Sequence, residues 1–261
     1  MFIVFVTTCG RANQEVKEKA YKTAKILDIP YILRKKRSIL HHMNLHEQDC
    51  LVIGKERLEL HTREDNSEPF FFHPNSASFR IKRIMRGESD PLVEAAGLKE
   101  GMSFLDCTLG LASDSIIASH IVGEKGKVVG IEANKYISHI LHHGLKDWVS
   151  PLHELNSAMN RITVINGHFQ DVLKSIPEDA FDVVYLDPMF EEALTDSHGI
   201  NPIRQWASYT GLTKEGIEEA IRVAKKRVVL KEHYQSPLFE ELGFHVIKRP
   251  SAKFHFGILR V

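Results

Sequence analysis

From residue 101 onward, short apolar runs alternate with segments in which apolar residues recur every three or four positions. The apolar runs predict strands at 103–108, 127–132, 161–167, 181–187 and 226–231. The periodic segments predict helices at 113–121, 134–144, 169–176, 213–224 and 237–243. Strands that are apolar along their whole length are typical of a parallel sheet covered by helices on both faces. This part of the chain is therefore predicted to be an α/β domain.

The last two apolar runs, at 245–249 and 254–261, are separated only by the sequence PSAK. That connection is too short for the helical crossover that parallel neighbours need. We therefore expect an antiparallel hairpin at one edge of the otherwise parallel sheet.

The first third of the chain has a different pattern. Short apolar runs predict strands at 2–7, 30–33, 50–54, 57–62 and 69–74, and a helical period predicts a helix at 13–27. The predicted division is a small α+β domain at 1–76, a basic linker and helix at 77–100, and the α/β domain at 101–261. Within the linker, the helix covers 90–96 and Gly97 ends it.

Composition is that of an ordinary globular protein, with 43% hydrophobic and 26% charged residues. No apolar run approaches the roughly 20 residues that span a bilayer. The start, MFIVFVTTCG, lacks the basic region and cleavage site of a signal peptide. We therefore expect a cytoplasmic protein with no membrane partner.

Cysteine and histidine spacing gives no metal-site pattern. Cys9, Cys50 and Cys107 are far apart, without a CxxC pair, which favours reduced thiols over disulfides. The pairs His41-His42 and His142-His143 have no cysteine or carboxylate at ligand spacing. We therefore expect no metal, and we interpret Cys107 as a small buried residue.

Charge is balanced overall but unevenly distributed. The chain has 34 Lys and Arg and 34 Asp and Glu, whereas residues 1–90 hold 16 basic against 12 acidic residues. The excess lies in RKKR at 34–37 and in RIKRIMR at 80–86, which follows Phe79. A basic cluster can be simply a solvated face, but two clusters with an aromatic neighbour also fit a polyanion partner.

Four successive strand ends carry polar or glycine residues. At the first, LDCTLGLASD, Gly110 lies in the turn and Ser113-Asp114 begins the helix. Glycine lets a backbone approach a ligand, and helix-start amides offer donors. The GxGxxG fingerprint of dinucleotide sites is absent, and the acids Asp106 and Asp114 favour a cationic or amine-bearing ligand over phosphates.

The other three strand ends extend this pattern. Glu132 ends the second strand, where a carboxylate can bind both hydroxyls of a ribose. His168 and Phe169 follow the third strand and could contact an adenine ring, and Asp187 ends the fourth. An acid after a strand is often only a helix cap. The four ends together favour S-adenosylmethionine (SAM) over NAD.

This order of strand ends resembles that of class I methyltransferases, and DPMF at 187–190 resembles their (N/D/S)PP(Y/F/W) motif for exocyclic amines. The resemblance implies that Asp187, Pro188 and Phe190 are catalytic. The acid and nearby carbonyls would accept hydrogen bonds from the target NH2, and the aromatic ring would stack on the base. Such catalysis depends on orientation and electrostatics, without a metal.

A closer resemblance is to the RsmJ-type small-subunit ribosomal RNA guanine-N2 methyltransferases. It is carried by RLELHTRED, FLDCTLGLASDS, VVYLDPMF and KKRVVLK, in the same order from about residue 50 to the end. It implies a Rossmann-like class I methyltransferase sheet with a small N-terminal domain. The cofactor positions that it implies are Ser113, Asp114, Glu132, Ala133, His168, Phe169 and Asp187, and those facing the RNA backbone are Arg80, Lys82, Arg83 and Arg86.

The sequence also departs from that family. CTLGLASD stands where the family has ATAGLGRD, and Glu191, Glu192 and Asp196 follow the motif where the family has basic residues. The leading hypothesis is a SAM-dependent methyltransferase acting on a guanine N2 amine in small-subunit rRNA. The alternatives are a tRNA, DNA or protein acceptor, or a non-catalytic SAM- or RNA-binding protein. Lys231, at the end of its strand, is interpreted as solvated rather than as a substrate contact.

Overall fold

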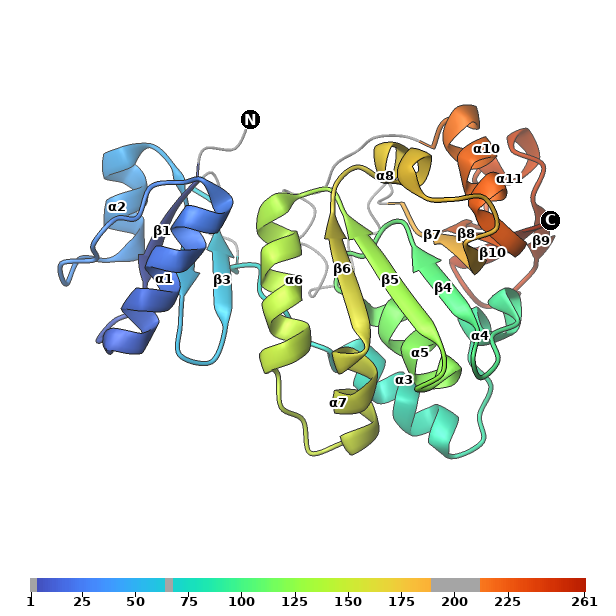
Figure 1. The fold of residues 1–261 in the computed structure, drawn as a ribbon, viewed down its shortest axis with the longest axis horizontal. Coiled ribbons are helices and arrows are strands. Elements are labelled where there is room, and N and C mark those ends of the chain that lie inside the picture. The colour runs from blue at the N-terminus through green and yellow to red at the C-terminus, as the bar shows by residue number, and fades with distance from the viewer. Residues whose placement is uncertain (1–3, 64–67, 189–211) are drawn as a thin grey trace. The chain divides into compact units, whose positions relative to one another are not determined.

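The computed structural model describes residues 4–63, 68–188 and 212–261 (Figure 1). These residues form two compact units. The first holds 4–73, with its gap, and 135–148, and the second holds 74–134, 149–188 and 212–261. Residues 77–100, assigned above to a separate linker, therefore belong to the second unit. None of the helices in the described ranges has the length and hydropathy needed to cross a membrane.

The first unit is built on a three-stranded sheet of order β1-β2-β3. Its strands are β1 (Val4–Thr8), β2 (Asp49–Ile53) and β3 (Leu58–His61), and its helices are α1 (Gln14–Leu27), α2 (Ile39–His46) and α6 (Lys135–Asp147). β1 and β2 are parallel, and β2 and β3 are antiparallel. The Asn13 side chain caps α1 by accepting from the Val16 amide. Phe5, Met43, Cys50 and Val52 pack together in the core.

The second unit holds a seven-stranded sheet of order β6-β5-β4-β7-β8-β10-β9. Its strands are β4 (Ser103–Asp106), β5 (Lys127–Glu132), β6 (Ile162–Asn166), β7 (Phe181–Leu186), β8 (Ala224–His233), β9 (His245–Ile247) and β10 (Phe254–Arg260). The pairs from β6 to β8 are parallel, and β10 is antiparallel to both β8 and β9. The predicted parallel sheet with an antiparallel edge hairpin is confirmed.

Helices cover both faces of this sheet (Figure 1). They are α3 (Asn75–Met85), α4 (Pro91–Ala96), α5 (Ser113–Val122), α7 (His153–Asn160), α8 (Phe169–Ser175), α10 (Lys214–Val223) and α11 (Leu238–Glu241). A continuous apolar core joins α8 and α10 to the central strands, with Phe169, Leu173 and Ile217 packed against Leu105 and Leu230. This packing fixes the strand ends from which the site residues extend.

At several places the structure differs from the elements that local patterns predict. The expected strands at 30–33 and 69–74 are single bridges, at Tyr31 and Phe70, because each has only one paired residue with β1 or β3. The helices α2, α3 and α7 were not predicted. In α3 the many basic residues make the helical period hard to see in the sequence, because its two buried residues are only Ala77 and Ile81, four positions apart.

Candidate active site

The loop from β4 to α5 is held by bonds to strands on either side. The amide of Leu109 donates to the Ile131 carbonyl at 3.0 Å, and the amide of Cys107 donates to the Tyr185 carbonyl at 2.9 Å. The buried Asp106 carboxylate accepts from the Thr108 amide (3.0 Å) and from the Ser115 hydroxyl (2.7 Å). Asp106 is therefore a loop-holding acid, and Cys107 is buried as expected.

Asp187 follows β7 and contacts two neighbouring elements. Its amide donates to Thr108 Oγ1 at 2.7 Å, which ties the end of β7 to the β4–α5 loop. Its carboxylate Oδ2 accepts from Lys231 Nζ at 2.6 Å. The parallel register explains the second contact: Leu186 pairs with Leu230, so the next residues along both strands are neighbours.

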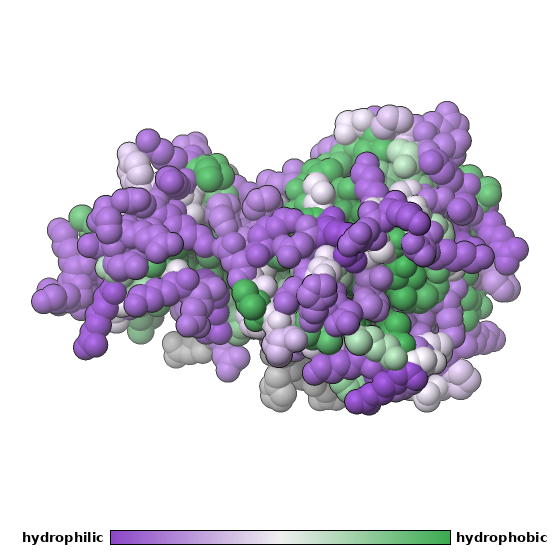
Figure 2. Space-filling view, turned by 60° about the horizontal axis from the view of Figure 1, so that its bottom comes forward, coloured by the Kyte–Doolittle hydropathy of each residue, from purple (hydrophilic) through white to green (hydrophobic). Residues whose placement is uncertain are grey.

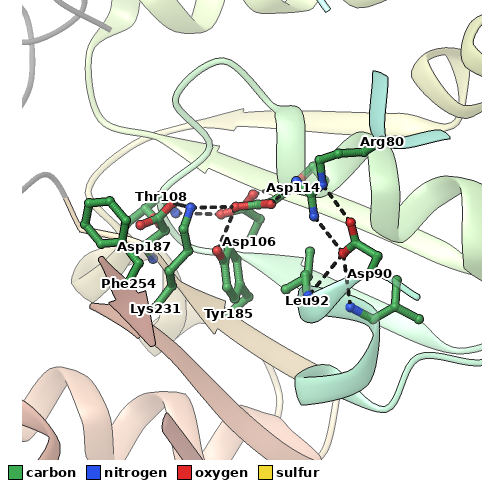
Figure 3. A network of polar contacts seen from close by, with 12 residues as sticks. Arg80, Asp90, Leu92, Asp106, Thr108, Asp114, Tyr185, Asp187, Lys231 and Phe254 are labelled. Atoms are coloured by element: carbon green, nitrogen blue, oxygen red, sulfur yellow. Dashed lines mark hydrogen bonds and ion pairs between the residues drawn. The ribbon is translucent and has the colours of Figure 1, made fainter. Parts of the chain in front are cut away.

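Asp114, in the first turn of α5, is the centre of a polar network (Figure 3). Its Oδ2 accepts from the Tyr185 hydroxyl at 2.7 Å and lies 3.3 Å from Lys231 Nζ. Its Oδ1 accepts from Arg80 Nη1. Three elements besides α5, namely β7, β8 and α3, therefore converge on one carboxylate.

Arg80 connects this network to α4. Its Nε and Nη2 each donate to Asp90 at 2.8 Å, in the bidentate geometry that suits a guanidinium. Asp90 also caps α4 by accepting from the Leu92 and Val93 amides. Only 19% of the Arg80 side chain is exposed. The prediction that Arg80 contacts RNA stays untested, but its guanidinium is already bound to two carboxylates.

The charges of the network shift the pKa values of its members in opposite directions. Burial disfavours the ionised Asp114 carboxyl, but Lys231 and Arg80 outweigh burial and lower its pKa. For Asp187 burial prevails: it raises the pKa, with help from Asp114 and against the effect of Lys231. The pKa of Lys231 is raised, because Asp114 and Asp187 together outweigh burial. Asp114 is therefore a fixed anion, and Asp187 is the more readily protonated acid.

Glu132 lies at the end of β5, next to the β4–α5 loop. Its Oε1 accepts from the Asn134 amide at 2.9 Å, and the Gly110 amide also bonds to this carboxylate. Burial nevertheless raises the pKa of Glu132 to about 7. Gly110 adopts a left-handed backbone with φ 51°, a conformation that glycine tolerates better than other residues. The structure thus brings two predicted cofactor residues together.

The end of β6 lies beside that of β5. The Asn166 side-chain amide donates to the backbone carbonyls of Glu132 (2.8 Å) and Ala133 (3.3 Å). The exposed His168 precedes α8 and makes no side-chain cap bond, whereas Phe169 is buried in the sheet core. His168 is therefore accessible to a ligand, while most of the Phe169 ring packs against protein.

The remaining predicted basic residues lie on α3 or at its end. Lys82 and Arg86 are exposed, and Arg83 is half-buried and pairs with Glu88 at 2.6 Å. The exposed Phe79 ring lies 5.9 Å from the Arg83 guanidinium carbon. Figure 1 places α3 along the edge of the second unit that Figure 2 turns toward the viewer, where hydrophilic and hydrophobic residues are mixed.

The structure corrects one interpretation and adds residues that the sequence analysis missed. Lys231 is not a solvated lysine: 25% of its side chain is exposed, and it bonds to two carboxylates. Tyr185 was treated only as a strand residue, although a hydroxyl within an apolar strand is a signal for a buried polar partner.

Pro188 is half-buried beside Asp187, and Phe190, Glu191, Glu192 and Asp196 lie outside the described residues.

The strand order β6-β5-β4-β7-β8-β10-β9 with its antiparallel β10, together with acids at the carboxyl ends of the parallel strands, fits a class I methyltransferase. The family described as "Putative SAM-dependent methyltransferase" matches residues 33–255, so the chain belongs to this family. The protein is a SAM-dependent methyltransferase.

Two relatives and one solved structure resemble the chain over most of its length. The chain is 48% identical over 255 residues to the uncharacterized protein YpiP of Bacillus subtilis, covering 98% of each. It is 27% identical to ribosomal RNA small subunit methyltransferase J of Buchnera aphidicola, covering 80% of this chain and 88% of that protein. A SAM-dependent methyltransferase of Neisseria gonorrhoeae has the same fold, with a TM-score of 0.61 at 17% identity, covering 98% and 95%.

Proposed function

We propose that this enzyme methylates the exocyclic N2 amine of a guanine in small-subunit ribosomal RNA. The observation that carries the proposal is the Asp187 carboxylate, which extends from the end of β7 and is bonded through Oδ2 to Lys231. Asp187 begins the DPMF sequence, and several relatives at 26–29% identity are named ribosomal RNA small subunit methyltransferase J.

In this proposal Asp187 orients the acceptor. Its carboxylate accepts a hydrogen bond from the guanine NH2, which directs the nitrogen lone pair toward the methyl donor. The negative charge also stabilises the positive charge that develops on the nitrogen. Because burial raises the pKa of Asp187, its carboxylate is also a better acceptor for the proton that the methylated amine loses. Phe190 stays the predicted stacking residue.

The donor set fits SAM. Glu132 would hold the two ribose hydroxyls, because its carboxylate lies at the end of β5 and its bonds in the described structure come from backbone amides. The β4–α5 loop lacks the glycines of a phosphate-binding loop, and its acids Asp106 and Asp114 are held by protein donors, which leaves Glu132 as the acid placed for the ligand. When bound, SAM supplies a methyl group activated by its sulfonium. Ser113 and Ala133 line the same strand ends, and His168 is accessible for an adenine contact.

We assign RNA backbone contact to Lys82, Arg83 and Arg86. The side chains of these three residues are exposed or half-exposed. The Arg80 guanidinium, in contrast, is already bound to two carboxylates. Changing all three to Ala is expected to weaken RNA binding uniformly and to lower the salt slope by about one per lost phosphate contact. A binding curve measured at several salt concentrations that shows the wild-type slope would remove α3 from the interface.

The acceptor is tested by mass spectrometry of ribosomal RNA nucleosides from cells with and without the protein. Loss of one N2-methylguanosine, restored by the wild-type protein and not by Asp187→Ala, is the expected result. Unchanged ribosomal RNA nucleosides would contradict the proposed acceptor. A loss confined to tRNA in the same cells would transfer the activity to that RNA.

A further inference from the structure

We propose that Lys231 is a positioning residue, which holds the Asp187 carboxylate so that one oxygen faces the acceptor amine. Asp114, anchored by Arg80 and Tyr185, holds Lys231 in turn. This inference rests on the proposed role of Asp187 as the acceptor-binding acid. It assigns to the network of buried charges a function in catalysis rather than in stability alone.

The bonds on the two Asp187 oxygens differ. Oδ2 accepts from Lys231 at 2.6 Å, whereas Oδ1 accepts no hydrogen bond from the described residues. A carboxylate oxygen can accept more than one hydrogen bond, and an acceptor NH2 needs one oxygen at a defined angle. With its amide bonded to Thr108 and one oxygen bonded to Lys231, Asp187 has little freedom to rotate.

Lys231 is itself fixed in place. A lysine ammonium on a flexible stem would ordinarily sample many rotamers. Here Nζ lies 2.6 Å from Asp187 and 3.3 Å from Asp114, and only 25% of the side chain is exposed. Asp114 cannot follow a moving lysine, because Tyr185 and Arg80 bind it from β7 and α3. The chain of contacts therefore ends on a rigid part of the second unit.

Asp187 is surrounded by charges of both signs. The cations are Lys231 from β8 and Arg80 from α3. The acids are Asp114 from α5, Asp106 from β4 and Glu232 from β8. The Tyr185 hydroxyl from β7 also lies in the network. Asp114 raises the cost of an ionised Asp187, and Lys231 is the directly bonded cation that opposes it. Asp187 in turn raises the pKa of Asp106 and of Glu232. Removing Lys231 should therefore both misplace the carboxylate and favour its protonated form.

The test compares Lys231→Met with Asp187→Asn and with the double variant in the full-length protein. The assay is methyl transfer from SAM to small-subunit RNA taken from cells that lack the protein. Lys231→Met is expected to lower kcat by about 10²-fold, the effect of a small misplacement in an active site, with little change in SAM affinity. The double variant should lose no more than Asp187→Asn alone, because Lys231 acts through Asp187.

The pH profile separates positioning from a purely structural role. In Lys231→Met the acid limb of kcat/KM should move to higher pH, because the base must be ionised and its stabilising cation is gone. Lys231→Arg keeps a cation and should keep the acid limb near that of wild type. The matched control is Lys226→Met, on the same strand, where Lys226 pairs with Asp182; it should leave both rate and profile unchanged.

A second readout needs no RNA. The titration of Asp187 is followed by carbon NMR of protein labelled at the aspartate carboxyl carbons, with Asp187→Asn to assign the signal. The pKa of Asp187 should be higher in Lys231→Met than in wild type. If Lys231→Met does not fold, wild type is compared with Lys231→Arg instead. The Asp187 pKa values of these two proteins should be nearly equal, and a large difference between them would contradict the inference.

The two proposals fail in different ways. If wild type transfers no methyl group to this RNA, or Asp187→Asn is fully active, the proposed function fails, and the carboxyl titration still decides the role of Lys231. If Asp187→Asn is inactive but Lys231→Met keeps the wild-type rate, pH profile and Asp187 pKa, the inference about Lys231 is overturned. A double variant whose loss equals the product of the two single losses would overturn it as well.

Discussion

Strands β7 and β8 are joined by a Lys–Asp pair at each end, and the two pairs differ in character. At the amino ends, Lys226 Nζ lies 2.8 Å from Asp182 Oδ1, and the lysine side chain is 54% exposed. At the carboxyl ends, Lys231 Nζ lies 2.6 Å from Asp187 Oδ2, and the lysine side chain is 25% exposed. The same two strands therefore present one pair near solvent and one pair inside a charged network.

The difference lies in what else the carboxylates bind. Asp182 Oδ2 accepts from both the amide and the hydroxyl of Ser103 at 2.8 Å, so both of its oxygens have donors. These bonds and Lys226 outweigh burial and lower the pKa of Asp182. Burial raises the pKa of Asp187 instead. A carboxylate satisfied on both oxygens serves structure, whereas one with a raised pKa at the end of a parallel strand is suited to bind a ligand.

The largest effect is expected from a substitution at the carboxyl end of β7. Asp187→Ala should lower methyl transfer by roughly 10²–10³-fold or more, because it removes the group that we propose orients the amine and stabilises its developing charge. Asp182→Ala, at the other end of β7, should keep the wild-type rate. Steady-state kinetics with circular dichroism as a fold check measure both. An active Asp187→Ala enzyme would remove DPMF from the mechanism.

Much of the second unit could be predicted because its signals are local. Apolar runs alternate with helical periods, and the short PSAK connection requires an antiparallel hairpin, which β9 and β10 form. The strand ends were also predicted, since an acid or a glycine stands at the end of the buried run or in the turn that follows it. Those positions are Gly110, Glu132 and Asp187, and the structure places the first two in contact.

The contacts that were missed depend on pairing between distant segments. Lys231 looks solvated when its strand is read alone, and only the register of β7 against β8 shows that it lies beside Asp187. Arg80 belongs to a basic cluster, but the turn of α3 on which it lies brings it toward Asp90 and Asp114. Neither register nor helix orientation is encoded in a short window of sequence.

Glu132 extends the comparison to a second acid at the carboxyl ends of the strands. Glu132→Gln should weaken SAM binding by about 10–100-fold, the value of a hydrogen bond to a charged group. Burial raises the pKa of Glu132 to about 7, so the free protein is increasingly protonated below that pH. If the ribose binds the ionised form, wild-type affinity rises as pH increases through 7 and then levels off.

Isothermal titration with SAM at several pH values measures this dependence. In Glu132→Gln the increase of SAM affinity through pH 7 should be much smaller than in wild type. A small increase can persist, because burial also raises the pKa of Asp106 to about 7. Equal affinity and equal pH dependence in the two proteins would exclude Glu132 from the cofactor site.

At the amino end of the sheet the expected effect is on stability. Asp182→Ala leaves the Ser103 amide and hydroxyl without their acceptor, which should cost about 1–3 kcal/mol in the free energy of unfolding. Because the folded pKa of Asp182 lies below its unfolded value, its stabilisation is present above about pH 4. It is lost as pH falls through the folded pKa. Urea unfolding at neutral and acidic pH should therefore show the difference between variant and wild type shrinking on acidification.

The smallest effect is expected for Lys226→Met, which removes the exposed half of the amino-end pair. An exposed lysine contributes at most about 1 kcal/mol to such a pair, and Ser103 continues to satisfy one oxygen of Asp182. The free energy of unfolding should change by less than about 0.5 kcal/mol, and high salt should remove even that difference. If Lys226→Met lost as much free energy of unfolding as Asp182→Ala, then Asp182 would depend on its lysine, as Asp187 is proposed to depend on Lys231. The contrast between the two ends of β8 would then lie in solvent exposure alone.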